Sequence, residues 1–278
     1  MLAPFLIMLR EGLEAALIVG IIAGYLTKTG RGAWMPAVWI GVFLAVALAL
    51  FSGAALQMVS ASFPQKVQEF FEAIVGIVAV AVLLSMVLWM RKAARTMGRD
   101  LRASVDKALA ESRAAPEWAL IAMVFLAVAR EGLETVFFLL AIFQQSPDAG
   151  APLGALLGLI VSAAVGYGIY AGALRLNLSL FFRWTGIFII FVAAGLLAGS
   201  LKALHEAGIW NGLQAQLYDL SAILPETSPL GTVLSGLLGY RDAPTMGEAG
   251  LYLLFLVLAL FFFLRPHKPQ AAAGATAS

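Results

Sequence analysis

The chain has 278 residues, of which 62% are hydrophobic and 12% are charged, with a formal net charge of +2. Soluble domains average roughly 45–50% apolar and about 25% charged residues, so this composition excludes an ordinary water-soluble domain and predicts an integral membrane protein. The chain contains no cysteine, which excludes disulfides and thiolate metal sites, and its two histidines are too few for a histidine-rich site.

Seven apolar runs are long enough to cross a bilayer as helices. A hydrocarbon core about 30 Å thick needs about 20 helical residues, and lipid cannot satisfy the backbone groups of any other structure with runs of this length. The runs lie near residues 4–26, 34–59, 70–90, 118–143, 152–173, 184–204 and 248–264. We therefore predict an all-α, multi-pass protein whose single transmembrane domain covers residues 1–265, with a disordered cytoplasmic tail at 266–278.

The basic residues predict the orientation of these spans. Thirteen lysines and arginines fall in the connections on one side, and only Lys66, Lys202 and Arg241 on the other. Because cytoplasmic connections are enriched in basic residues, we expect the N-terminus outside and the C-terminus inside. The segment 91–113 then predicts a helix on the cytoplasmic surface.

The longest outer connection is the loop at about 205–247. It contains an apolar stripe that favours an interfacial helix, formed by Trp210, Leu213, Leu217 and Leu220.

The chain also contains an internal repeat. The segment FLIMLREGLEAALIVGI around Arg10 is matched by FLAVAREGLETVFFLLA around Arg130. Each predicted unit, about 1–92 and about 117–206, holds three spans, and an odd number of crossings inverts the second unit in the membrane. The span at 248–264 is then an addition. Inverted repeats are typical of secondary transporters, whose substrate sites lie near the bilayer midplane.

Each repeat carries one arginine and two glutamates in the middle of a span. Helical geometry places the three charged residues of each unit on one face. Because one ionised residue at the helix centre costs roughly 2.5–3.5 kcal/mol in lipid, we expect the two charged faces to turn inward toward each other. The glycines within the motifs, Gly12 and Gly132, permit close helix approach or local unwinding.

The two clusters together predict a cation site. Its expected carboxylate ligands are Glu11, Glu14, Glu131 and Glu134, with Arg10 and Arg130 as their charge partners. Four carboxylates and two guanidinium groups leave a formal charge of −2, and carboxylate oxygens favour hard ions such as magnesium, calcium, manganese or ferric iron. The alternative structural interpretation is that the charges only pair within a helix bundle.

Further acids lie at the outer ends of two spans. Glu69 and Glu72 are spaced i, i+3, and His205 is followed by Glu206. These four are candidate outer ligands that collect the ion, or ordinary interfacial residues. A membrane metalloenzyme would need an additional histidine or nucleophile near the midplane, which the spans lack. An exporter, or a permease for another hard divalent cation, remains open on the residues alone.

Several segments resemble the oxidase-dependent iron transporter family, the high-affinity iron permeases, and in particular its bacterial EfeU-type branch. They are PFLIMLREGLEAALIV, FPQK, LWMRK, VAREGLETVFFLLA, RLNL, FVAAGL and HEAG, and they extend over nearly the whole chain. Two REGLE motifs at equivalent positions within spans are far more specific than one alone.

The resemblance implies iron uptake across the bacterial inner membrane, with ferrous or ferric iron as the transported substrate. The four REGLE glutamates would hold the iron, and Glu69 and Glu72 would handle it on the outer side. Bacterial members imply a periplasmic cupredoxin-like protein and a haem peroxidase as partners. No permanently bound cofactor, no nucleic-acid partner and no enzymatic activity are expected.

Overall fold

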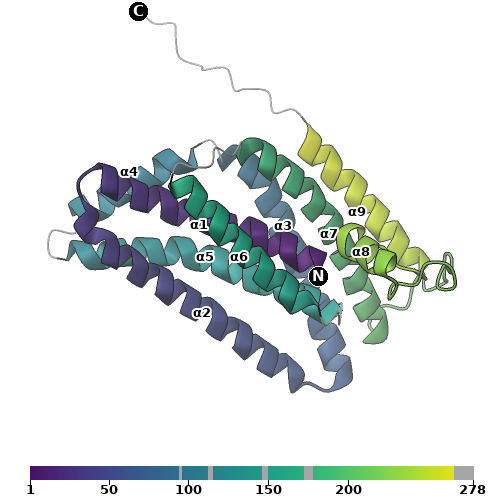
Figure 1. Ribbon diagram of the computed structural model, residues 1–278. Helices are drawn as coiled ribbons and strands as arrows, with labels where there is room; N and C mark the ends of the chain where they lie inside the picture. The colour runs from purple at the N-terminus through teal and green to yellow at the C-terminus, as the bar shows by residue number, and fades with distance from the viewer. Residues whose placement is uncertain (94–95, 112–114, 146–149, 172–177, 266–278) are drawn as a thin grey trace, which may run out of the picture.

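The computed structural model describes residues 1–93, 96–111, 115–145, 150–171 and 178–265. The predicted tail at 266–278 lies outside the described residues. Every regular element in the described ranges is a helix (Figure 1). In chain order they are α1 (Leu2–Lys28), the 3₁₀ turn η1 (Gly32–Trp34), α2 (Met35–Ala61), α3 (Gln65–Ala93), α4 (Met97–Glu111), α5 (Pro116–Gln145), α6 (Ala151–Tyr170), α7 (Leu178–Glu206), α8 (Pro229–Leu238) and α9 (Met246–Leu264).

Five helical segments are long and apolar enough to cross a membrane. They are Gly32–Ser60, Gln65–Met90, Ala151–Tyr170, Leu180–Glu206 and Met246–Leu264, and they coincide with five of the seven predicted spans. The other two predicted spans coincide with α1 and α5, which have 27 and 30 residues but carry the charged REGLE motifs in their middles. The all-helical membrane architecture is therefore confirmed, whereas the count of seven crossings stays a prediction.

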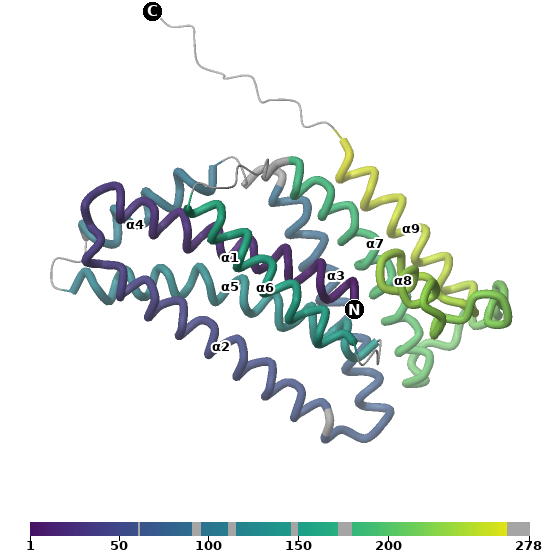
Figure 2. The backbone as a smooth tube through the Cα atoms, in the orientation of Figure 1, coloured from purple at the N-terminus to yellow at the C-terminus, as the bar shows by residue number. Residues whose placement is uncertain are grey.

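The long helices associate in three closely packed pairs: α1 with α6, α2 with α5, and α3 with α7 (Figures 1 and 2). Helix α9 packs against α7 at the edge of the bundle (Figure 1). Contacts along α1 and α6 advance together, from Met1 with Gly154 to Ala16 with Gly166, so these two helices run parallel.

Small residues spaced four apart explain how closely the first two pairs pack. On α6 the stripe consists of Gly154, Gly158, Ser162 and Gly166. On α2 the equivalent stripe consists of Gly41, Ala45, Ala49 and Gly53. A Cβ on Gly158 would lie 2.5 Å from the Phe5 carbonyl oxygen, and a Cβ on Gly41 would lie 2.9 Å from the Ile121 carbonyl oxygen. Such stripes let backbones approach closely where lipid provides no hydrophobic drive for association.

Two clusters of buried apolar side chains lie at either end of α1 and α5. One includes Ile7 of α1 and Phe138 of α5, together with residues of α3, α7 and α9. The other includes Ile22 of α1 and Val124 of α5, together with residues of α2 and α4. On α5 the REGLE motif falls between the positions of the two clusters, whereas on α1 the first cluster also includes Leu17, which follows the motif.

The segment between α7 and α9 differs from the prediction. The interfacial helix expected around Trp210–Leu220 is wrong, because this stretch is irregular and the helix in the loop is α8. Gly208 and Leu213 adopt positive φ values of 76° and 56°, which interrupt any helix there. The helix expected within 91–113 is present as α4, and its position on the cytoplasmic surface stays a prediction.

Candidate metal centre

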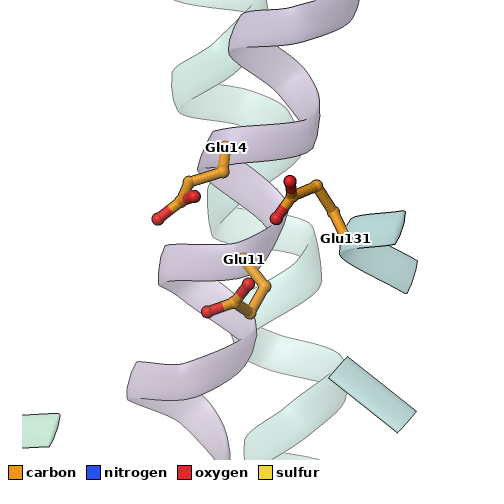
Figure 3. A group of neighbouring side chains, drawn as sticks. All are labelled: Glu11, Glu14 and Glu131. Atoms are coloured by element: carbon orange, nitrogen blue, oxygen red, sulfur yellow. The ribbon is translucent and has the colours of Figure 1, made fainter. Parts of the chain in front are cut away.

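Three buried glutamates from two helices lie close together (Figure 3). Glu11 and Glu14 come from α1, Glu131 reaches toward them from α5, and each offers a carboxylate oxygen within 4.8 Å of the other two. Their exposed fractions are 2%, 2% and 8%. Ligand oxygens lie about 2.0–2.6 Å from a bound ion, so two oxygens on opposite sides of the ion are about 4–5 Å apart. The spacing of the three carboxylates therefore suits a single cation.

The glycine of each motif fixes the helix face that carries the acids. Gly12 packs against the Ser162 side chain of α6 so closely that no Cβ fits, and a Cβ on Gly132 would lie 3.0 Å from Ala49 Cβ on α2. Both helices are continuous through these glycines. Of the two predicted roles for the glycines, the structure therefore shows close approach and not unwinding.

Arg10 is sealed inside the site. Its side chain lies within 3.2 Å of Glu14 Oε1 through Nε and within 3.8 Å of Glu11 Oε1 through Nη1. Its exposed fraction is 1%. One guanidinium group therefore pairs with two carboxylates on α1, which leaves a net negative charge.

Several of these oxygens lack a hydrogen-bond donor. Both carboxylate oxygens of Glu11, Oε1 of Glu14 and Oε2 of Glu134 are buried without a hydrogen bond. Buried charged groups are costly unless they are paired or coordinate a metal. The unsatisfied oxygens therefore fit a site that receives a cation.

Glu134 and Arg130 complete the second motif, but in a different environment. Glu134 is a charged neighbour of Glu11, Glu14 and Glu131, and its Oε1 accepts a hydrogen bond of 3.0 Å from Arg130 Nε. Unlike Arg10, the Arg130 side chain is 54% exposed. The inward-facing position expected for both arginines is thus found for Arg10 but only in part for Arg130.

The outer candidates gather at the ends of α3 and α7 without forming a comparable ligand set. Glu72 has Glu206, Lys202 and Glu69 among its charged neighbours, and Lys202 Nζ lies 3.7 Å from Glu206 Oε1. The Nε2 atom of His205 is buried and has no hydrogen-bond partner. Among the described residues, only Glu11, Glu14 and Glu131 form a group of three close metal-ligating side chains.

The prediction from sequence missed one buried acid and did not identify one hydrogen bond between two helices. Glu248 of α9 is buried and lies 3.7 Å from Arg241 Nη1. Gln145 of α5 donates a hydrogen bond to the Leu196 carbonyl of α7. A charged residue in the first turn of an apolar span was a visible signal for Glu248, whereas no sequence pattern links it to Arg241.

Fold and site together define a helical membrane protein with three buried, closely spaced carboxylates between two of its helices. The chain matches the Iron permease FTR1 family over residues 1–265, and it belongs to this family. It is 52% identical over 274 residues to the ferrous iron permease EfeU of Yersinia pestis, covering 99% of this chain and 96% of that protein. It is 51% identical over 278 residues to the ferrous iron permease EfeU of Escherichia coli O6:H1, covering 100% and 99% respectively. No solved structure matches the chain.

These matches confirm the resemblance stated from the motifs. They also confirm a transporter rather than an enzyme, because the family and the matched relatives are permeases. Iron is the transported substrate of this family.

Proposed function

We propose that this chain imports iron across the bacterial inner membrane through a midplane site formed by the two REGLE motifs. The observation that carries the proposal is the convergence of Glu11, Glu14 and Glu131 within 4.8 Å, from two helices, with buried oxygens of Glu11 and Glu14 that accept no hydrogen bond. With Glu134 and the two arginines, the site has a formal charge of −2. A ferrous ion would offset this charge, so that the loaded site is neutral in a low-dielectric surrounding.

We also propose that α1 and α5 cross the membrane, which together with the five apolar spans gives seven crossings. Helices α1 and α5 bury most of their charged residues against each other, which removes the main cost of placing them in lipid. The orientation that we propose has the N-terminus outside, with α4 and its basic residues in the cytoplasm.

The helix pairing supports an inverted repeat. If α1, α2 and α3 correspond to α5, α6 and α7, then the pair α1–α6 corresponds to the pair α5–α2. The contacts agree in detail, because Gly12 meets Ser162 in one pair and Gly132 meets Ala49 in the other. The two glycines are 120 residues apart in the sequence, and their partners Ala49 and Ser162 are 113 apart. The same offset of 113 residues relates every small residue of the α2 stripe to one of the α6 stripe.

The remaining functional proposals concern partners and substrate form. Glu69, Glu72, His205 and Glu206 lie where a collecting site on the periplasmic side would be, next to the outer loop where a periplasmic cupredoxin-like protein and a haem peroxidase would dock. The matched relatives are named ferrous iron permeases. Carboxylates also bind ferric iron and other hard divalent ions. The test should therefore compare ferrous with ferric iron and measure the selectivity for iron over manganese.

The test is uptake of labelled iron into proteoliposomes under an imposed membrane potential, with ferrous iron under reductant and ferric iron compared in parallel. Groups that only orient metal ligands already matter about 10–100-fold, so Glu14→Gln and Glu131→Gln should each reduce uptake at least that much. Glu117→Gln is the matched control, because Glu117 is an exposed acid in the first turn of α5. Full uptake by the Glu14→Gln/Glu131→Gln double variant, or net export, would overturn the proposal.

A further inference from the structure

A cavity of about 590 Å³ lies under the outer segment. Its walls come from the first turn of α1, the last turns of α5, the outer half of α7 and the segment from Glu226 to Arg241. Polar side chains in the lining include Gln145, Glu226, Thr232, Ser235 and Tyr240. The candidate outer acids Glu69, Glu72, His205 and Glu206 are not in the lining, although Lys202 and Arg241 lie both in the lining and beside Glu72.

The two basic side chains of the cavity are matched by acids. Lys202 lies 3.7 Å from Glu206, and Arg241 lies 3.7 Å from the buried Glu248. The cavity therefore presents carboxylate, hydroxyl and amide oxygens without a net excess of positive charge. This is a lining that a hydrated cation tolerates.

Three features follow one another along α1, starting from its N-terminus: the cavity, an apolar side chain and the metal site. Pro4 lines the cavity, Ile7 follows about one turn later, and Glu11 lies one further turn inward. At 1.5 Å per residue, Pro4 and Glu11 are about 10 Å apart along the helix axis.

Along α5 the same order recurs in the opposite chain direction. Ile142 lines the cavity, Phe138 follows one turn inward, and Glu134 lies one further turn inward. Both Ile7 and Phe138 have an exposed fraction of 0% and belong to the same apolar cluster. A single apolar layer therefore separates the cavity from the carboxylates.

From this order we propose that the cavity is the outer vestibule that receives the hydrated iron ion, and that Ile7 and Phe138 form a closed gate between it and the REGLE site. The proposal rests on the proposed function. Moving a charged ion through a packed apolar layer is very unfavourable, so transport requires these two side chains to separate. The structure is then closed toward the outside.

The first experiment tests the vestibule and exploits the absence of native cysteine. A single cysteine at Ser235→Cys, in the lining, is treated from outside with a bulky, positively charged, membrane-impermeant methanethiosulfonate. We expect modification to abolish most iron uptake relative to the same variant before treatment. Ile223→Cys is the matched control, because Ile223 lies in the same outer segment, is 80% exposed and does not line the cavity.

If the modified Ser235→Cys protein transports as well as the untreated variant, the vestibule assignment is wrong. If Glu14→Gln abolishes uptake in the same preparation, the proposed function stands without the vestibule. If Glu14→Gln has no effect, the proposed function itself fails.

The second experiment tests the gate by labelling alone. Ile7→Cys should resist the outside reagent in an otherwise unchanged chain and become reactive when combined with Phe138→Ala. Phe182→Ala is the control for a lost aromatic ring in the same apolar cluster, and it should leave Ile7→Cys unreactive. Phe138→Leu serves as a milder opening if the alanine variant does not accumulate. Equal reactivity of Ile7→Cys with and without the Phe138 substitutions would overturn the gate.

Discussion

The guanidinium carbon of Arg130 lies 5.1 Å from the centroid of the Trp89 ring. The position of the Arg130 side chain therefore depends on a neighbouring aromatic ring of α3. The side chain of its counterpart Arg10 is instead fully enclosed by the surrounding helices. The ring covers one side of a cation that is otherwise half exposed, while Arg130 Nε holds Glu134.

We expect Trp89→Leu to weaken iron binding while leaving the maximal transport rate less affected. Cation–π contacts contribute about 0.5 to 2 kcal/mol depending on desolvation, which corresponds to roughly 2–30-fold in affinity. Trp89→Phe should retain part of the effect. Trp118→Leu is the control, since Trp118 is 69% exposed on α5, and an equal loss in both leucine variants would show that the contact is not specific.

The buried and the exposed arginine should differ in their contribution to stability. Arg10→Ala leaves Glu11 and Glu14 without their partner, and breaking a buried ion pair typically costs about 3–5 kcal/mol. Arg130→Ala should cost clearly less, because that side chain is partly exposed. Thermal unfolding of both variants in detergent measures the difference, and equal losses would contradict the asymmetry of the two motifs.

The contact between Gly12 and Ser162 predicts a rescue. Gly12→Ala places a methyl group against Ser162, and overpacking of this kind costs about 1–3 kcal/mol. Ser162→Gly in the same chain removes the obstructing side chain and should restore most of the thermal stability. Gly24→Ala is the control, because no atom outside its own helix lies within 4 Å of the added methyl group. Failure of the second substitution to rescue would mean that this contact does not limit the approach of α1 and α6.

Asp106 should hold α4 against the C-terminal end of α1 over a wide pH range. The Tyr25 hydroxyl, at 2.6 Å, and Arg31, at 2.8 Å, both donate to this carboxylate and lower the pKa of Asp106 below its ordinary value of 3.8. A lowered carboxyl pKa adds stability that is present above the ordinary value and is lost as the pH falls through the folded value. The attachment should therefore persist at pH 5 and be lost only below pH 3.8.

A spin label at Ala110→Cys reports this attachment, because Ala110 lines a cavity together with Tyr25, Arg31 and Asp106. The label should be equally restricted at pH 7 and pH 5 and become mobile below pH 3.8. With Asp106→Asn added, it should be mobile throughout. A label that becomes mobile already near pH 5 would contradict the lowered pKa.

Much of the helical layout was predictable, because apolar length is a strong signal. The boundaries moved where polar residues extend a helix beyond its apolar part, as at Gln65, where α3 begins before the predicted run at 70–90. Sequence periodicity also placed the acids of each motif on one face. It could not tell that Gln145 and Arg241, far apart in sequence, share one cavity.

The near identity of the two REGLE motifs hid their difference. Burial of Arg10 and exposure of Arg130 arise from neighbours on other helices, including Trp89, and the motif itself contains no information about them. The four-residue spacing of small residues on α2 and α6 is visible in the sequence, but the spacing alone does not say which helix packs against each stripe.

The pairing of α1 with α6 and of α2 with α5 has a consequence for biogenesis. Neither α1 nor α2 has its closest companion in its own half of the chain. The nascent polypeptide therefore cannot complete the α2–α5 pair until the ribosome has passed Gln145, or the α1–α6 pair until it has passed Tyr170. At about 5–20 residues per second, this interval is on the order of ten seconds. During that time the acids of α1 have no matching helix, and the insertion machinery or the unfinished chain itself must shelter them from lipid.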